Sequence, residues 1–308
     1  MTTITELEPV HDSRHALRPG PYARESLVFM LQLPEHDVAS WLYTWVNGEG
    51  RAGRIGAAFG PAVKDGPIFE AVDGIAVPDS MGFDTWSVGR LDVRHGEALE
   101  RAQAAYVGER MQIEYEFEAM HPAYAYGSHR DGCPPYVADN RFEQSGRVRG
   151  VLTVDGREFP FETYGHRDHS WGTRDWGAAQ HWKWMECQAG EDTAVHFFDI
   201  SAVGRRQLRG YIHRDGLTSP IVDVASRFET DPQLWHTSIS AQVRDEAGRE
   251  VQVDGTTFAR VLLPASPLLH LNECSMAVTI DGQPGVGHVE MAWPPDYITH
   301  VVESGLAG

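Results

Sequence analysis

Hydrophobic and polar residues alternate with a period of two along most of the chain, a pattern typical of β-strands with one buried and one solvated face. The alternation is clearest in Met111–Glu118, where three apolar side chains fall on one face and three glutamates on the other. Ser26–Leu33 and Trp41–Val46 are rich in the aromatic and β-branched residues that favour strands. The same criteria predict strands over a series of later segments: Val148–Val154, His181–Gln188, Ala194–Ser201, Gln207–Arg214, Ser219–Glu229, Ser238–Arg244, Thr257–Leu263 and Cys274–Ile280.

Asp-Gly pairs, which favour tight β-hairpin turns, occur beside several of these segments. They are Asp155-Gly156, Asp215-Gly216, Asp254-Gly255 and Asp281-Gly282. One short helix is predicted, over Gly96–Tyr106, and no short internal repeat is visible. Many short strands with glycine-rich turns predict an all-β fold built from antiparallel sandwich or barrel domains.

Two strand-rich halves are separated by a passage rich in glycine and histidine. The first half runs to about Thr163 and the second begins near His181. We therefore place the domain boundary near residue 178 and expect two β domains, residues 1–178 and 179–308. A chain of 308 residues is long enough for each domain to bury its own core.

The charge of the chain argues against two classes of partner. The sequence contains 26 Lys and Arg against 44 Asp and Glu, a formal net charge of −18. An acidic surface repels phosphate groups, so we expect neither nucleic acid nor an anionic membrane as a partner. No apolar stretch is long enough to span a bilayer, and Met1–Arg14 lacks the apolar core of a signal peptide.

The cysteines are few and far apart. Cys133, Cys187 and Cys274 are odd in number and form no C-x-x-C pair, so neither a disulfide framework nor a zinc motif is predicted. We therefore expect a reducing, cytoplasmic location. The sequence leaves a homodimer open.

The segment Tyr164–Trp184 differs from the rest of the chain. Its 21 residues contain three of the 15 histidines and four of the nine tryptophans. Glycines at 165, 172 and 177 predict an irregular, tightly folded loop before His181. Because such loops often hold functional groups on a rigid scaffold, we place the chemistry of the protein here.

A structural explanation of this segment is that its charged residues form buried ion pairs, since charged groups are buried only when paired. The pairs would come from Arg167, Asp168, Arg174 and Asp175, with the tryptophans as core.

An acid–base explanation is the one we favour. Asp168 or Asp175 would fix the tautomer and orientation of His166 or His169, and histidine titrates near neutrality. A carboxyl group among tryptophans could also stay protonated near pH 7 and donate its proton to an alkene or a leaving group. Neighbouring indole faces would stabilise a developing cation.

A metal site is a third explanation. His166, Asp168 and His169 would supply the ligands, joined by His181 or Glu186, because imidazole with carboxylate suits zinc or iron. The spacing matches no specific metal motif, and our primary prediction includes neither a metal nor an organic cofactor.

The strand after the loop could form a wall of the binding site. Trp182, Trp184 and Glu186 would lie on one face of that strand, either as a pocket wall or as ordinary core. His196 and His288 are interpreted as structural histidines. No G-x-G-x-x-G fingerprint, phosphate loop or G-x-S-x-G elbow occurs, which argues against nucleotide enzymes and serine hydrolases.

Residues 140–185 resemble a known family. The segments that carry the resemblance are Phe142–Val148, Val154-Asp155-Gly156 and, above all, Arg167-Asp168-His169-Ser170-Trp171-Gly172, with a closing strand Gly287–Glu290. They are similar to the two-domain lipocalin-like proteins that include the AttH-like proteins and the carotenoid 1,2-hydratases.

The resemblance implies two lipocalin-like antiparallel barrels with a small-molecule cavity, and cofactor-independent hydratase or cyclase chemistry on hydrophobic isoprenoid, polyketide-like or aromatic substrates. It assigns the acid–base role to Asp168 and His169 and places Trp171 and Trp176 near the cavity. We add His166 and Asp175 as candidate catalytic residues, and list as candidate substrate-binding residues Tyr164, Arg167, Trp171, Arg174, Trp176, Trp182, Trp184 and Glu186.

The function predicted is therefore a lyase, hydratase, isomerase or cyclase for a hydrophobic small molecule. The alternatives are a carrier for an apolar ligand and a metal-dependent enzyme that uses His166, Asp168 and His169.

Overall fold

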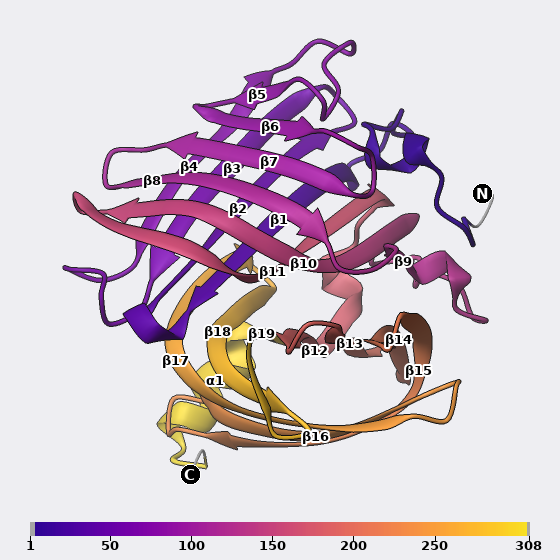
Figure 1. Cartoon of the computed structure of the whole chain (residues 1–308), viewed down its shortest axis with the longest axis vertical. Coiled ribbons are helices and arrows are strands. Elements are labelled where there is room, and N and C mark those ends of the chain that lie inside the picture. The colour runs from indigo at the N-terminus through magenta and orange to yellow at the C-terminus, as the bar shows by residue number, and fades with distance from the viewer. Residues whose placement is uncertain (1–3, 307–308) are drawn as a thin grey trace. The chain divides into compact units, whose positions relative to one another are not determined.

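The computed structural model describes residues 4–306, and almost all of its regular secondary structure consists of antiparallel strands (Figure 1). The chain divides into two compact units, residues 1–174 and 175–308, where the sequence suggested a division near residue 178. Each unit is a curved antiparallel sheet, so the all-β, lipocalin-like fold is confirmed. In the part of the chain described, no helix is both long and apolar enough to cross a membrane.

The first unit is built on one large sheet with the strand order β4-β3-β2-β1-β11-β10-β8-β7-β6-β5, and β9 pairs with β10. Figure 1 shows β8, β7, β6 and β5 side by side in that order. The strands are β1 (Ala23–Leu33), β2 (Val38–Asn47), β3 (Arg51–Phe59), β4 (Ile68–Ala76), β5 (Trp86–Val88), β6 (Leu91–His95), β7 (Arg101–Val107), β8 (Met111–Ala119), β9 (Tyr124–Ala125), β10 (Asn140–Val154) and β11 (Arg157–Thr173). Short 3-10 turns lie at Pro9–Asp12, Pro34–His36 and Tyr126–Ser128.

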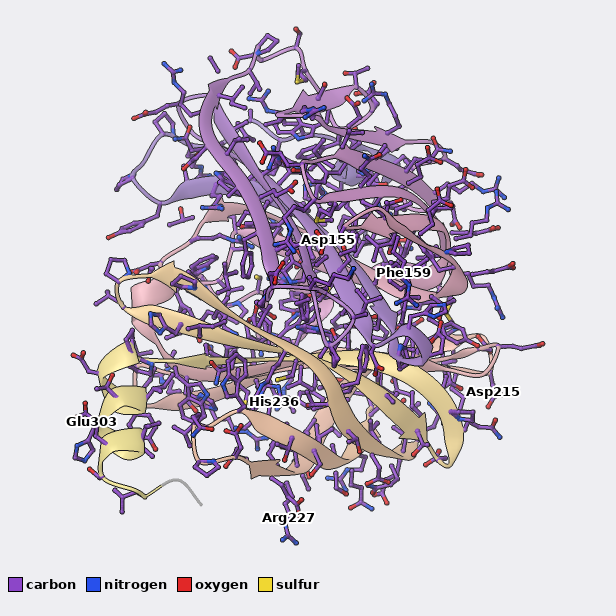
Figure 2. The ribbon with its side chains drawn as sticks, turned by 90° about the vertical axis from the view of Figure 1, so that its left-hand side faces the viewer. Asp155, Phe159, Asp215, Arg227, His236 and Glu303 are labelled. Atoms are coloured by element: carbon purple, nitrogen blue, oxygen red, sulfur yellow. The ribbon has the colours of Figure 1, made fainter. Side chains whose placement is uncertain are left out.

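The second unit is a closed barrel of eight strands in sequential order, followed by one helix. A 3-10 turn at Trp176–Ala178 precedes it. The strands are β12 (Ala179–Ala189), β13 (Thr193–Ala202), β14 (Arg205–Arg214), β15 (Leu217–Thr230), β16 (His236–Asp245), β17 (Glu250–Ser266), β18 (Leu269–Ile280) and β19 (Gln283–Trp293), and the helix is α1 (Pro295–Glu303). Asp155 and Asp215, labelled in Figure 2, stand at the β10–β11 and β14–β15 turns.

Each unit has its own apolar core, because alternate side chains of every strand point to the same face of a sheet. In β1 the core residues are Leu27, Phe29 and Leu31, and in β8 they are Ile113, Tyr115 and Phe117, as the alternation predicts. The barrel of the second unit is filled from β12, β18 and β19 in the same way, for example by Met185, Met276 and Val289. The side chains between these positions point to the opposite face.

Two local predictions are wrong. Gly96–Tyr106 is not a helix: its second half belongs to β7, where Ala102, Ala104 and Tyr106 are buried in strand alternation. The loop predicted before His181 is mostly strand, because β11 runs without interruption to Thr173. Gly165 serves close packing between strands rather than a turn, since a Cβ there would lie 2.6 Å from the Tyr115 hydroxyl oxygen.

Candidate active site

The β11 strand sorts the predicted site residues onto two faces. His166, Asp168 and Ser170 point to one face, whereas Arg167, His169 and Trp171 point to the other, which is the core face of the first unit. The pairing with β10 places Glu143 opposite Asp168 and Ser145 opposite His166. The first of these faces therefore brings Glu143, Ser145, His166 and Asp168 into neighbouring positions. We call these four residues the carboxylate row.

Arg141 links the two acids of the carboxylate row. Its Nε donates to Glu143 Oε1 at 2.6 Å, and its Nη2 donates to Asp168 Oδ2 at 2.9 Å. Tyr126 also donates its hydroxyl hydrogen to Glu143 Oε1 at 3.0 Å. All four side chains are buried, and a buried charge needs partners of this kind to be stable. The arginine thus holds both carboxylates in fixed positions.

His166 continues the row. Its Nε2 lies 2.8 Å from Glu143 Oε2, and its Nδ1 lies 3.2 Å from the Ser145 hydroxyl oxygen. Since an ionised carboxylate can only accept, Nε2 carries the hydrogen in this bond, and a neutral imidazole then accepts from Ser145 at Nδ1. Glu143 therefore fixes the tautomer of His166, a role that the sequence suggested for Asp168 or Asp175.

Asp168 is the member of the row best suited to donate a proton. Burial raises the pKa of its carboxyl group, while the nearby Arg141 opposes that shift and Glu143 adds to it. Its Oδ2 is held by Arg141, but its Oδ1 is buried and has no hydrogen-bond partner among residues 4–306. A buried carboxyl oxygen without a partner is uncommon and offers a position for a proton or for a polar atom of a ligand.

Arg174 lies at the end of the same face. It donates to the Ser170 hydroxyl oxygen through Nη2 and to the Tyr43 hydroxyl oxygen through Nη1 at 3.3 Å. The Ser26 hydroxyl oxygen lies 3.2 Å from that of Ser170. Arg174 thus stands among hydroxyl groups rather than in an ion pair with Asp175.

The core face holds a second polar cluster around Glu25 of β1. Oε1 of Glu25 lies 2.8 Å from His169 Nε2 and 2.7 Å from His15 Nδ1, and it also accepts from the His15 backbone nitrogen. His15 stacks on Trp171, with ring centroids 3.9 Å apart. Phe83 and Phe142 contact His169 edge-on, and its Nδ1 is buried without a hydrogen-bond partner within the described chain.

Arg167 also belongs to the core face and forms an ion pair with Asp12. Its Nη1 lies 3.0 Å from Asp12 Oδ1, and its Nε donates to Gln144 Oε1 at 2.9 Å. Burial alone would raise the pKa of Asp12, but Arg167 and His95 outweigh it and lower the pKa to about 2. Arg167 therefore anchors the N-terminal segment and does not orient Asp168, which lies on the opposite face.

The sequence-predicted metal ligands do not converge. His169 points away from His166 and Asp168, so these three side chains cannot bind one ion. In the first unit, a group with ligand atoms all within 4.8 Å of one another is His15, Glu25 and His169. Two imidazoles and a carboxylate suit zinc or iron, although here both histidines hydrogen bond to Glu25.

The predicted residues Tyr164 and Asp175 have other partners. Tyr164 precedes it on β11 and stacks with Arg147, whose guanidinium carbon is 5.6 Å from the ring centroid. In the second unit, Asp175 accepts from the Gly177 backbone nitrogen at the turn that contains the half-buried Trp176. Asp175 thus caps a turn, and no bond to a histidine is seen within the described residues.

The side chains predicted on β12 share one face of the second unit. Trp182 donates its indole hydrogen to Glu290 Oε1, Trp184 contacts His196 and His288 edge-on, and Glu186 accepts from Gln188. His181 points to the other side, and its Nδ1 donates to the Ala292 carbonyl oxygen. Burial lowers the pKa of His181 to about 4, so it is neutral near pH 7.

A family model described as a domain of unknown function, DUF7064, matches residues 8–295 of the chain. The chain belongs to the DUF7064 family. None of the curated proteins matches it in sequence.

Solved structures similar to this DUF7064 chain share its fold. A Nitrosomonas europaea protein solved as a candidate AttH, NE1406, aligns with a TM-score of 0.63 and 15% identity, covering 88% of this chain and 92% of that protein. CghA solved with Sch210972 aligns with a TM-score of 0.67 and 14% identity, covering 90% and 89% of the two chains. CghA alone gives a TM-score of 0.64 at the same identity and coverage. The resemblance to AttH-like proteins is thereby confirmed at the level of the fold.

Glu25, Arg141 and Glu143 of this DUF7064 chain were not among the site residues predicted from the sequence. A usable indication existed for the last two: counting outward from the Asp155-Gly156 turn places Glu143 opposite Asp168 and Arg141 opposite Ser170. Glu25 lies 144 residues from His169 along the chain, and no local pattern joins them.

Proposed function

We propose that the protein is an acid–base enzyme that acts on a hydrophobic small molecule without an organic cofactor, and that Asp168 is its proton donor. The observation that carries this proposal is the state of the Asp168 carboxyl group. One oxygen is fixed by Arg141, whereas the other is buried and lacks a hydrogen-bond partner among the described residues. A carboxyl group held in this way can keep a proton near neutral pH and release it to a bound substrate.

In the proposed proton transfer, the two carboxyl oxygens of Asp168 have different roles. The O–H bond at Oδ1 breaks as its proton moves to an unsaturated carbon or an oxygen of the substrate. The carboxylate that remains keeps the hydrogen bond from Arg141 at Oδ2, which stabilises its charge. The same carboxylate recovers a proton from a neighbouring C–H bond in an isomerisation or cyclisation, or from an attacking water in a hydration.

Glu143 and His166 would position this group rather than react. Glu143 shares Arg141 with Asp168, and its negative charge favours the protonated form of the neighbouring carboxyl. Support for a small-molecule ligand comes from CghA, a protein of similar fold whose structure was solved with Sch210972.

The test is a comparison of three proteins in one metabolite extract analysed by untargeted mass spectrometry. Wild-type protein should change at least one hydrophobic compound, and Asp168→Asn should reduce the rate of that change by about 10²–10⁴-fold. Asp92→Asn is the matched control, because Asp92 is half-exposed and lies 3.9 Å from Arg94 in a surface ion pair. Circular dichroism of each variant checks that the fold is intact.

The mass change identifies the reaction: gain of water indicates a hydratase, loss of a fragment a lyase, and equal mass with a new retention time an isomerase or cyclase. Equal rates for wild type and Asp168→Asn would remove Asp168 from the mechanism. Retention of one compound, unaltered, by all three proteins would favour the alternative function, a carrier for an apolar ligand.

A further inference from the structure

The two units contain the same hairpin. In the first unit, β10 carries Glu143 and Ser145 and β11 carries His166; in the second, β18 carries Glu273 and Ser275 and β19 carries His288. In each hairpin the serine pairs directly with the histidine across the two strands, and a glycine precedes the histidine. The repeat is not visible in the sequence, because the first hairpin is longer and only scattered positions match.

The hydrogen bonds of the two hairpins are equivalent as well. Ser275 Oγ lies 3.0 Å from His288 Nδ1, and His288 Nε2 lies 2.7 Å from Glu273 Oε2. The corresponding distances in the carboxylate row are 3.2 Å for Ser145 to His166 and 2.8 Å for His166 to Glu143. Both turns consist of Asp-Gly with positive φ, 49° and 78° for Asp155-Gly156 and 50° and 80° for Asp281-Gly282. The second unit therefore contains a copy of the carboxylate row.

The two rows differ in charge at one position. In both rows two acids face each other across the strands. Asp168 pairs with Glu143 in the first row, and Glu290 pairs with Glu273 in the second. Arg141, which binds both acids in the first row, corresponds to Leu271 in the second. No ion pair joins Glu273 to an arginine or lysine within residues 4–306, and His288 and Glu290 are its side-chain partners.

The surroundings of Glu273 favour its protonated form. Glu273 is 5% exposed, and Val261 of β17 pairs with it on the side opposite Glu290. The groups that face it from β19 are the carboxyl of Glu290 and the imidazole of His288. Burial raises the pKa of Glu273 to about 8, with Glu290 opposing the shift. Glu290 is half-buried and its carboxyl group hydrogen bonds to that of Glu273, a contact that two carboxyl groups make when one of them is protonated.

An aromatic surface lies beside this acid pair. Trp184 of β12 pairs with Glu290, and Phe198 of β13 pairs with Trp184, so these side chains share one face. The Trp182 indole donates to Glu290 Oε1 and contacts Phe198 edge-on, with ring centroids 5.7 Å apart. A proton donor next to aromatic faces suits an apolar substrate and a developing cation.

We propose that the second unit contains a further acid–base site, in which Glu273 and Glu290 share one proton and Glu273 donates it to an unsaturated carbon or a carbonyl oxygen of a neutral, apolar small molecule. This extends the function proposed for Asp168 and rests on it. In the step, the Glu273 O–H bond breaks and a C–H or O–H bond forms on the substrate. The carboxylate left behind accepts a hydrogen bond from His288 Nε2. It recovers a proton when a neighbouring C–H or O–H bond of the protonated intermediate breaks, so no other reactant is needed.

The first half of the test needs no substrate. Protein labelled with ¹³C at the glutamate carboxyl carbons is titrated by NMR, and Glu273→Gln identifies the signal of Glu273. The signal should titrate near pH 8. Leu271→Arg restores the arginine of the first row and should move this titration to lower pH. A Glu273 signal that is ionised throughout the neutral range in wild-type protein would overturn the proposal.

The second half uses the metabolite extract described for Asp168. At least one compound that wild-type protein transforms should be transformed at least tenfold more slowly by Glu273→Gln, because the amide can donate a hydrogen bond but not a proton. If Glu273→Gln transforms every such compound at the wild-type rate while Asp168→Asn does not, this proposal alone is overturned. If wild-type protein transforms no compound, both this proposal and the proposed function fail.

Discussion

His169 Nε2 lies 2.8 Å from Oε1 of Glu25, so the acid that holds this histidine comes from β1 and not from the adjacent Asp168. The finding separates two clusters that the sequence places side by side. His169 and Trp171 bind the N-terminal segment through His15, whereas His166 and Asp168 belong to the carboxylate row.

Replacing Glu25 with Gln should destabilise the first unit, because the buried imidazole of His169 and the half-buried imidazole of His15 would lose a shared charged acceptor. We expect a loss of about 2–4 kcal/mol in the free energy of unfolding, measured by urea denaturation at pH 7. Glu118→Gln is the control, since Glu118 is an exposed partner of Arg101 and should change stability by less than about 0.5 kcal/mol. Similar effects of the two substitutions would contradict the role given to Glu25.

Asp12 should make the protein sensitive to acid. Its folded pKa is about 2, below the ordinary 3.8, so its stabilising contribution is complete above pH 3.8 and disappears as the pH falls to 2. The contribution is about 2.5 kcal/mol at 1.36 kcal/mol per unit. Asp12→Asn should therefore be less stable than wild type at pH 7, with the difference shrinking in acid. A constant difference at all pH values would show that Arg167 does not lower the pKa of Asp12.

Glu273 should destabilise the folded protein as the pH rises through the neutral range. Its folded pKa, about 8, is higher than the ordinary 4.5, so folding is penalised progressively as the pH rises from 4.5 to 8. Glu273→Gln removes the penalty and should gain stability relative to wild type over that range, by an amount on the order of 4 kcal/mol at its upper end. The measurement is the unfolding free energy of both proteins at pH 5, 7 and 9. A difference that does not change with pH would show that Glu273 is ionised in the folded state.

Gly165→Ala tests the close packing of β11 between its neighbours. The new Cβ would lie 2.6 Å from the Tyr115 hydroxyl oxygen and 2.8 Å from the Met30 carbonyl oxygen, so β1 or β8 would have to shift. We expect a loss of about 1–3 kcal/mol, measured by thermal and urea unfolding. At Gly96, by contrast, an added Cβ makes ordinary contact at 3.6 Å, and Gly96→Ala should cost little. If both variants are as stable as wild type, β11 is packed less tightly against Tyr115 than the structure indicates.

The strand content could be predicted because a period of two is a local property. Ile113, Tyr115 and Phe117 are buried as their spacing requires, while Gln112 and Glu114 between them are exposed. The prediction failed where residue type was given more weight than spacing. A helix was predicted over Gly96–Tyr106, although the alternation of Ala102 and Ala104 with exposed residues fits the strand that forms there.

The candidate site was located on the correct strand but with the wrong partners. Asp168 and His166 lie in the row, yet the residues that control them are Arg141 and Glu143, on the preceding strand. Cross-strand partners depend on register, and a register is set by the turn rather than by the segment that carries the motif. Burial could not be read from composition either, because the same Arg-Asp-His sequence could occupy an exposed loop.

The equivalent hairpins of the two units bear on the origin of the chain. Each carries Glu-x-Ser before an Asp-Gly turn and Gly-His after it, and the first hairpin is longer by four residue pairs. Duplication of an ancestral single-barrel gene would leave this pattern: shared buried positions, with insertions confined to the ends of strands. The Arg141 and Leu271 positions then mark a divergence between the copies: one hairpin has an arginine that binds both of its acids, and the other has a leucine at that position.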